Sequence, residues 1–300
     1  LPTALNRGFA RARGEYLSWI SADNICLPHF CSTLVNALRA FPQAGFASGG
    51  FARMAPQVWL LDRLEGAVSL STLLCNNTGV AAFMYRRDVA MQVGGYDPKL
   101  EGAEDWDMWL RMLDVTLPVS VSHLLYHYRL HGNSMSAKLP EKVRESSTRT
   151  AFKALQRLEQ GGGVRRLFPQ IEQCKNQELA LFHANLVLGS RMIAPESFLK
   201  RAAAKYLGIA YNMRPDDLRA IGNFAVALCW QGRQDEAKEL FCRGKKQDTQ
   251  LFDELQAECA RQYRNAGSYS FQCTILPCPG PEESELMRQV AASHLRFAKR

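Results

Sequence analysis

The sequence lacks several features that would place it in familiar classes of protein. Its nine cysteines contain no CxxC pair and no histidine at zinc-finger spacing, which argues against a structural zinc site and favours reduced thiols in a cytosolic protein. No apolar run approaches the roughly 20 residues that span a bilayer. The N-terminus, LPTALNRGFARARGEY, has no apolar centre of the kind found in signal peptides. It also has no initiating Met, so we expect the chain to start inside a longer protein.

A basic surface interleaved with aromatic residues is also missing, so no nucleic-acid partner is expected. The net charge of +8 is uneven along the chain. Residues 1–140 hold 12 Lys plus Arg against 11 Asp plus Glu, whereas residues 141–300 hold 25 against 18. The basic excess of the second half fits solvated helix faces best, with an anionic lipid or a sugar diphosphate as alternative partners.

The first part of the chain alternates between strand and helix patterns. EYLSWI (15–20), VAAFMY (80–85) and HLLYHYRLH (123–131) are typical of strands. Apolar residues at helical spacing follow Pro28 until Pro42, and EDWDMWLRML (104–113) has one apolar face. This alternation predicts an α/β domain with a mainly parallel sheet over residues 1–138.

The second part of the chain has helical patterns almost throughout. We expect a helical connector over residues 139–180 and an all-α domain over 181–300, with a proline-rich loop at 268–283 and a last helix after it. Two segments, Ala184–Asp217 and Leu218–Leu251, echo each other at a spacing of 34 residues and resemble degenerate tetratricopeptide repeats. The matched positions are Ala203, Leu207, Ala210 and Pro215, then Ala237, Phe241, Gly244 and Thr249. A plain helical bundle explains the pattern equally well.

One acidic residue, Asp23, follows the first predicted strand in WISADNICLP. Ligands of open α/β sheets bind beyond the carboxyl ends of strands, and we expect a helix directly after this residue. Asp23 is therefore a candidate oxygen ligand for a divalent cation that bridges two phosphates. A turn or helix-capping role is the alternative, and this stretch alone favours it.

Three acids, Glu104, Asp105 and Asp107, crowd the first turn of the helix predicted at 104–113. Acids are common there because they interact well with the helix dipole. The functional interpretation is a general base at Asp105. The helix terminus lowers the pKa of such a carboxyl, whereas neighbouring acids and burial raise it, and the sequence does not decide between these effects.

Arg129 and His131 alternate along the last predicted strand, so we expect them to point to the same side of the sheet. A cation and a possible metal ligand that project together suit a diphosphate and its metal. For His131 alone, a surface histidine is the preferred explanation.

The ordered set LNRGFARARGEYLSWISADN, FMYRRDVAMQVGGYDPKLEGAEDWDMWLRM and LYHYRLHGNS closely resembles family 2 glycosyltransferases of the GT-A fold over residues 1–136. The segment GGYDP…EGAEDWDMWLR carries most of the specificity. The resemblance implies a partial, Rossmann-like GT-A domain and an inverting transfer of a sugar from a nucleotide-diphosphate donor to an acceptor hydroxyl.

The resemblance also implies roles for individual residues. Asp105 would be the catalytic base, with Glu104 positioning it or the acceptor. Asp23 would hold Mg²⁺ or Mn²⁺ on the diphosphate, with His131 as a further metal ligand. The remaining residues implied for the donor side are Asn6, Arg13 and Arg129, and those for the acceptor side are Asn76, Asn77, Trp106, Trp109 and Arg111.

Two departures from the family pattern matter. The first acid of the family's metal motif is replaced by Ser21 or Ala22, depending on the register. The family's first strands, which hold the nucleobase, have no counterpart before Leu1, so we expect the chain to begin midway through the nucleotide-binding half.

Two functional hypotheses follow. The first is a glycosyltransferase for cell-surface polysaccharide or glycan synthesis, acting on a glycan or lipid-linked acceptor in the cytoplasm or on the inner face of the membrane. The second is a non-catalytic interaction protein, in which the helical part recruits a protein partner and the transferase part is a remnant.

Overall fold

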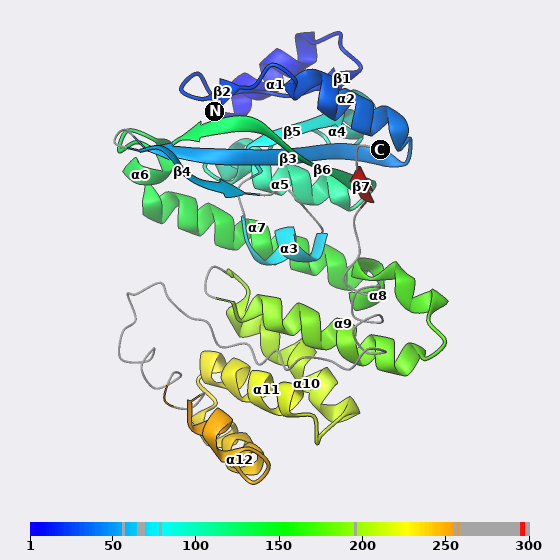
Figure 1. Ribbon diagram of the computed structural model, residues 1–300, viewed down its shortest axis with the longest axis vertical. Helices are drawn as coiled ribbons and strands as arrows, with labels where there is room; N and C mark the ends of the chain where they lie inside the picture. Colours follow the sequence, from blue (N-terminus) through cyan, green and yellow to red (C-terminus); the bar gives the residue numbers. More distant parts are fainter. Residues whose placement is uncertain are drawn as a thin grey trace. The chain divides into compact units, whose positions relative to one another are not determined.

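The computed structural model describes residues 1–55, 58–64, 70–77, 80–194, 197–254, 257 and 295–297. The chain divides into two compact units, Leu1–Leu155 with His294–Arg300, and Gln156–Ser293 (Figure 1). The first unit is α/β and the second is helical where it is described, which confirms the predicted fold class. The finer domain boundaries after residues 138 and 180 remain predictions. The loop at 268–283 and the helix predicted after it lie outside the described residues.

The described strands of the first unit form one mixed sheet in the order β1-β5-β3-β6-β2, with β4 paired to β3 and β7 paired to β6. Parallel pairing joins β3 to β6 and β6 to β7, whereas the other described pairs are antiparallel. The prediction of a mainly parallel sheet is therefore wrong, because an apolar run does not encode the direction of its neighbours. The strands are β1 (Tyr16–Leu17), β2 (Ile25–Cys26), β3 (Ala44–Ala55), β4 (Val58–Leu64), β5 (Ala82–Arg86), β6 (Leu117–Arg129) and β7 (Leu295–Phe297).

Helices cover both faces of this sheet (Figure 1). Helix α2 (Phe30–Ala40) buries Leu34 in a core cluster that includes Ala47 of β3. The preceding residue of β3, Phe46, points the other way and packs against Trp109 of α5 (Glu104–Leu113), with ring centroids 6.1 Å apart. Alternation of side chains along β3 thus fixes α2 and α5 on opposite faces of the sheet.

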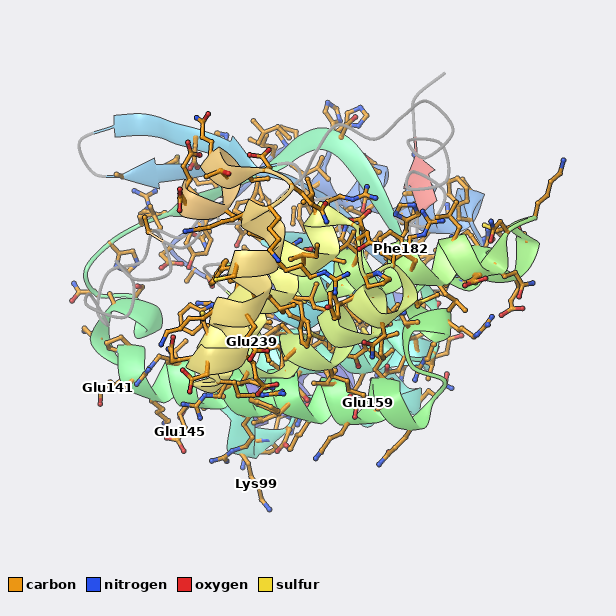
Figure 2. All side chains as sticks on the ribbon, turned by 90° about the horizontal axis from the view of Figure 1, so that it is seen from below. Lys99, Glu141, Glu145, Glu159, Phe182 and Glu239 are labelled. Atoms are coloured by element: carbon orange, nitrogen blue, oxygen red, sulfur yellow. The ribbon has the colours of Figure 1, made fainter. Side chains whose placement is uncertain are left out.

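The long helix α7 (Pro140–Gln160) packs its small residues inward and exposes Glu141 and Glu145 on its outer side (Figure 2). Further helices of the first unit are α1 (Pro2–Arg11), α3 (Leu70–Cys75), α4 (Arg87–Gln92), the 3-10 turn η1 (Pro98–Leu100) and α6 (Met135–Lys138). The prediction for 104–113 matches α5 at both ends.

The second unit contains short segments and four longer helices among its described residues. They are α8 (Val164–Leu167), η2 (Pro169–Gln173), α9 (Gln177–Met192), η3 (Lys200–Ala202), α10 (Ala203–Met213), α11 (Leu218–Gln231) and α12 (Gln234–Lys245). Asp217 caps α11 by accepting hydrogen bonds from two of its first amides. In the two predicted repeats, Leu207 is buried on α10 and Phe241 is buried on α12. The assignment as tetratricopeptide-like repeats remains a prediction.

In the part of the chain that the structure describes, no helix combines the length and apolarity needed to cross a membrane.

Two local expectations around Asp23 need correction. The strand expected at 15–20 is limited to Tyr16–Leu17, and the helix expected directly after Asp23 begins only at Phe30. A turn and strand β2 come between, because β2 pairs with β6 through Ile25 and His127 and so holds the chain extended. Strands β3 and β4 had no counterpart among the predicted elements.

Candidate functional site

Asp23 lies in a turn at the edge of the sheet, beside the end of β6. The Asn24 amide donates to the Ser21 carbonyl at 3.1 Å, which closes the turn. Arg129 holds it from the strand: its amide donates to Asn24 Oδ1 at 2.8 Å, and its Nε donates to the Asp23 carbonyl at 2.9 Å. Strand β6 ends at Arg129, so the sequence expectation that His131 lies on this strand is wrong.

His131 nevertheless reaches the same turn. Its Nε2 lies 2.6 Å from Asp23 Oδ2 in a partly exposed contact. The structure therefore brings together the three residues that the sequence assigned to the diphosphate and metal end, Asp23, Arg129 and His131. They come from two segments that are joined by the β2–β6 pairing.

The Asp23 and His131 side chains offer two of the ligands that a divalent cation needs. Neighbouring ligand atoms of a six-coordinate Mg²⁺ lie about 3 Å apart, so a small movement from 2.6 Å would admit an ion. Within the described residues, no group of three or more His, Cys, Asp or Glu could hold a metal. The pair thus fits an ion that takes its other ligands from phosphate oxygens and water, as Mg²⁺ commonly does.

Asp105 stands in the first turn of α5, where its Oδ1 accepts a hydrogen bond of 2.6 Å from the Trp106 amide. Burial is the main effect that raises its pKa, to about 7, and the negative charge of Glu104 adds to it. Bonds to the amides of Trp106 and Asp105 itself oppose this shift. The sequence left this balance open, and the structure resolves it in favour of burial.

Glu104 is 3% exposed, and its Oε2 accepts a hydrogen bond of 2.5 Å from the Gly102 amide. This bond closes the turn before α5 and fixes the Glu104 carboxylate beside Asp105. A carboxyl whose pKa lies near neutral pH can both take up and release a proton, which is the property that a general base needs.

Tyr128, on β6, responds electrostatically to both candidate clusters. Its pKa is raised by burial, and then by the negative charges of Asp23 and Asp105. Both carboxylates therefore lie within electrostatic reach of one half-buried tyrosine. Tyr128 was not among the predicted site residues, although it lies in the stretch LYHYRLHGNS.

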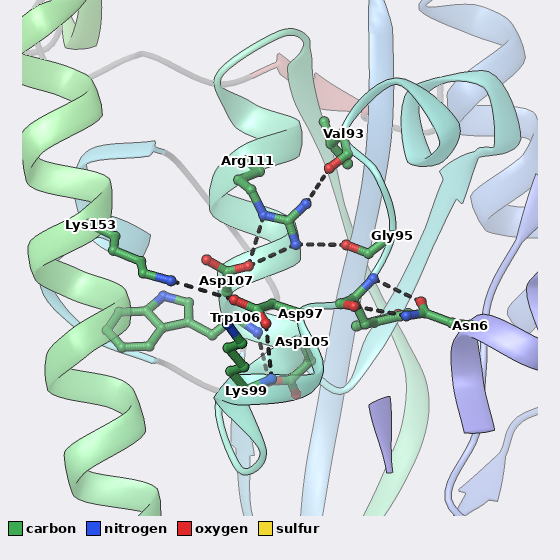
Figure 3. A network of polar contacts seen from close by, with 11 residues as sticks. Asn6, Val93, Gly95, Asp97, Lys99, Asp105, Trp106, Asp107, Arg111 and Lys153 are labelled. Carbon is green, nitrogen blue, oxygen red and sulfur yellow. Dashed lines mark hydrogen bonds and ion pairs between the residues drawn. The ribbon is translucent and has the colours of Figure 1, made fainter. Parts of the chain in front are cut away.

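Asn6 and Arg111 make contacts inside the unit rather than facing open space (Figure 3). Asn6 Nδ2 donates to the Tyr96 carbonyl at 2.8 Å, and Asn6 Oδ1 accepts from the Tyr96 amide at 2.9 Å. Arg111 donates to Asp107 Oδ2 at 2.8 Å through Nε, to the Gly95 carbonyl at 2.7 Å, and to a second carbonyl of the same loop. Both residues thus hold the loop that leads to α5.

Trp106 and Trp109 lie on α5 and are almost completely buried. Trp106 Nε1 donates to the Leu73 carbonyl of α3 at 2.7 Å, which ties α3 to α5. Asn76 and Asn77 directly follow α3 and are half-buried. These two asparagines therefore follow a helix that is anchored to α5, and their acceptor role remains a prediction. Arg13 is exposed after the end of α1, and its donor role also remains a prediction.

Comparisons with known proteins agree with this picture. The family model described as glycosyl transferase family 2 matches residues 1–91. The O-antigen biosynthesis protein RfbC of Myxococcus xanthus is 27% identical over 164 residues, which cover 51% of this chain and 12% of RfbC. The chain thus spans a small fraction of the length of this relative. The family match confirms the predicted resemblance for residues 1–91, and the resemblance of the motifs beyond residue 91 remains a prediction.

Proposed function

We propose that this protein is an inverting glycosyltransferase that moves a sugar from a nucleotide-diphosphate donor to an acceptor hydroxyl. The family match over residues 1–91 supports the reaction class. The name of the M. xanthus relative supports a role in polysaccharide synthesis. The acceptor would then be a glycan or a lipid-linked saccharide, and peripheral attachment to the inner face of a membrane would suit a lipid-linked one.

One observation carries the proposal. Asp105 is a carboxyl with a pKa raised to about 7. A separate cluster joins Asp23 to the basic side chains of Arg129 and His131. The charges of Asp105 and Asp23 both raise the pKa of Tyr128. A single-displacement transfer needs this division, with a base on the acceptor side and positive charge on the leaving-group side.

In the proposed reaction, Asp105 takes the proton of the acceptor hydroxyl as its oxygen attacks the anomeric carbon. The bond from that carbon to the diphosphate oxygen breaks, and the configuration inverts because no enzyme–sugar bond forms. Arg129, exposed at the end of β6, would contact the departing diphosphate through its terminal nitrogens, since its Nε is already bonded to the Asp23 carbonyl.

Asp23 and His131 would hold the divalent cation, which supplies positive charge to the diphosphate when bound. The resemblance to family 2 glycosyltransferases implied Mg²⁺ or Mn²⁺. The imidazole favours Mn²⁺, because Mg²⁺ prefers oxygen ligands. We therefore expect Mn²⁺ to support binding of UDP or GDP better than Mg²⁺ does.

The test is calorimetric titration of the chain with UDP and with GDP, with Mn²⁺, with Mg²⁺ and with EDTA. The proposal expects metal-dependent binding of at least one nucleotide, and loss of that metal dependence in His131→Ala. His29→Ala is the matched control, because His29 is an exposed histidine of the same unit whose side chain makes no capping bond. If both nucleotides bind with the same affinity with and without metal, and with and without the His131 side chain, the metal part of the proposal is refuted.

The alternative is an interaction protein whose helical part binds a protein partner. Helices α9 to α12 pack in sequence, as helical repeats do, whereas the raised pKa of Asp105, a carboxyl in the first turn of α5, suits a general base. We therefore favour the enzyme. If the chain binds nucleotide but turns over none of the UDP-sugars and GDP-mannose, the interaction protein becomes the better explanation.

A further inference from the structure

The hydroxyl of Tyr96 lies where three segments of the first unit meet. Tyr96 is 2% exposed. Its oxygen accepts a hydrogen bond of 2.9 Å from Trp19 Nε1 and lies 3.0 Å from the Tyr85 hydroxyl. A buried hydroxyl with two partners has a fixed position, because each lost bond leaves a polar atom unsatisfied.

The backbone of Tyr96 is fixed as firmly as its side chain. Asn6 of α1 bonds to both its amide and its carbonyl (Figure 3). Its ring stacks on Phe9, with centroids 5.9 Å apart and an angle of 21° between the planes. Gly95, at φ +73°, lies so close to Asn6 that a Cβ added at Gly95 would be 2.9 Å from Asn6 Oδ1. The residue therefore has little freedom to move.

The two ends of the Trp19–Tyr96 bond lead to the two candidate clusters. Trp19 stands at the start of WISADN, whose turn carries Asp23. Tyr96 stands in the loop that leads through Glu104 to Asp105, and the charges of these two acids add to burial in raising its pKa. The bond thus links the segment that leads into the donor-side turn to the loop that leads to the base.

We propose that Tyr96 is a positioning residue that sets the distance between the donor turn at Asp23 and the base at Asp105. The catalytic part of this inference rests on the proposed function, whereas the structural part does not. Reacting groups that are misplaced by about 1 Å can lose about a hundredfold in rate, so one rigid link between the two clusters has a large effect.

The structural part is tested without any substrate, by hydrogen exchange with mass spectrometry on the peptides that cover residues 15–24 and 101–109. Tyr96→Phe keeps the ring and removes the hydroxyl. We expect the exchange rate of the donor-turn peptide, residues 15–24, to rise about tenfold or more, because loss of the Trp19–Tyr96 hydrogen bond releases this segment from the loop. Trp19→Phe removes the same bond from the other side and should also raise the exchange rate in the donor-turn peptide, because Asn6 and Phe9 still hold Tyr96.

Tyr85→Phe is the matched control, since it also removes a buried hydroxyl bonded to Tyr96 but leaves the Trp19 bond in place. It should leave the donor-turn peptide protected. Equal exchange in the donor turn of Tyr96→Phe and Tyr85→Phe, whether raised or unchanged, would overturn the proposal. If Tyr96→Phe does not fold, Trp19→Phe decides the question alone.

The catalytic part is tested on release of UDP or GDP from UDP-glucose, UDP-galactose, UDP-N-acetylglucosamine and GDP-mannose. We expect Tyr96→Phe to lower kcat about tenfold or more and to change the donor KM less than about twofold. Unchanged kcat with raised exchange would overturn the catalytic part. If the unmodified chain releases no nucleotide from any donor, the proposed function fails, while the exchange experiment still decides whether Tyr96 links the two clusters.

Discussion

Replacing Asp105 with asparagine should stabilise the first unit at alkaline pH while it abolishes transfer. The Asp105 carboxyl has a pKa raised from 3.8 to about 7, mainly by burial. The folded state therefore holds this proton more tightly than the unfolded chain does. The stability that it contributes is complete at low pH and is lost as the pH rises from 3.8 to about 7. Above pH 7, the folded protein carries a poorly solvated charge that asparagine removes.

The size of the effect follows from the same pKa. A change from 3.8 to about 7 corresponds to about 4 kcal/mol. Asp105 is partly exposed, which screens its charge and lowers the expected gain to about 2–3 kcal/mol. For a unit of this size, such a gain raises Tm by about 5–10 °C. At pH 4 the wild-type carboxyl is also protonated, so the advantage of Asp105→Asn should nearly vanish.

Calorimetric scans at pH 4, 6 and 8 measure this difference. Asp107→Asn is the matched control, because Asp107 lies on the same helix, is 3% exposed and pairs with Arg111. Its loss should lower Tm at pH 6 and pH 8, since it leaves Arg111 without its ion-pair partner. A pH-independent difference between wild type and Asp105→Asn would refute the burial argument.

Three further outcomes are expected. Asp23→Ala should remove the metal dependence of UDP or GDP binding by calorimetry; if the dependence persists, Asp23 is only a turn residue. Gly95→Ala should lower the free energy of unfolding in urea by about 2–3 kcal/mol and Gly94→Ala by about 1 kcal/mol. Both glycines have positive φ, but only Gly95 lies against Asn6, so equal losses would contradict this contact. Asp217→Ala should cost about 3 kcal/mol, because it removes the α11 cap and the partner of buried Arg219, and an unchanged urea midpoint would contradict this.

Helices with regular apolar spacing were predictable from the sequence. Helix α5 matches its prediction, because Trp106, Leu110 and Leu113 recur at helical spacing and are buried as expected. Helix α2 follows its pattern between the two flanking prolines for the same reason.

Strand β3 was not predictable, because AGFASGGFARMA is poor in branched residues and rich in glycine. The structure explains this composition. A Cβ at Gly49 would lie 2.5 Å from Leu125, and one at Gly45 would lie 2.7 Å from Val89. The glycines let neighbouring side chains close over the central strand, and this requirement depends on contacts between distant segments.

The site was predictable in its composition but only partly in its geometry. The grouping of Asp23, Arg129 and His131 followed from motifs and holds in the structure. The loop-holding contacts of Asn6 and Arg111 did not follow, because their partners are backbone atoms, which no residue type reveals.

The central claim is that Asp105 is the base of an inverting sugar transfer. Proton NMR of the sugar released from UDP-α-glucose, UDP-α-galactose, UDP-α-N-acetylglucosamine or GDP-α-mannose tests it directly, with water or a panel of monosaccharides as acceptor. The account predicts that the first product has the β configuration, that the rate rises with pH through about 7, and that Asp105→Asn gives no product while still binding nucleotide. A product that keeps the α configuration, or normal turnover by Asp105→Asn, would contradict it.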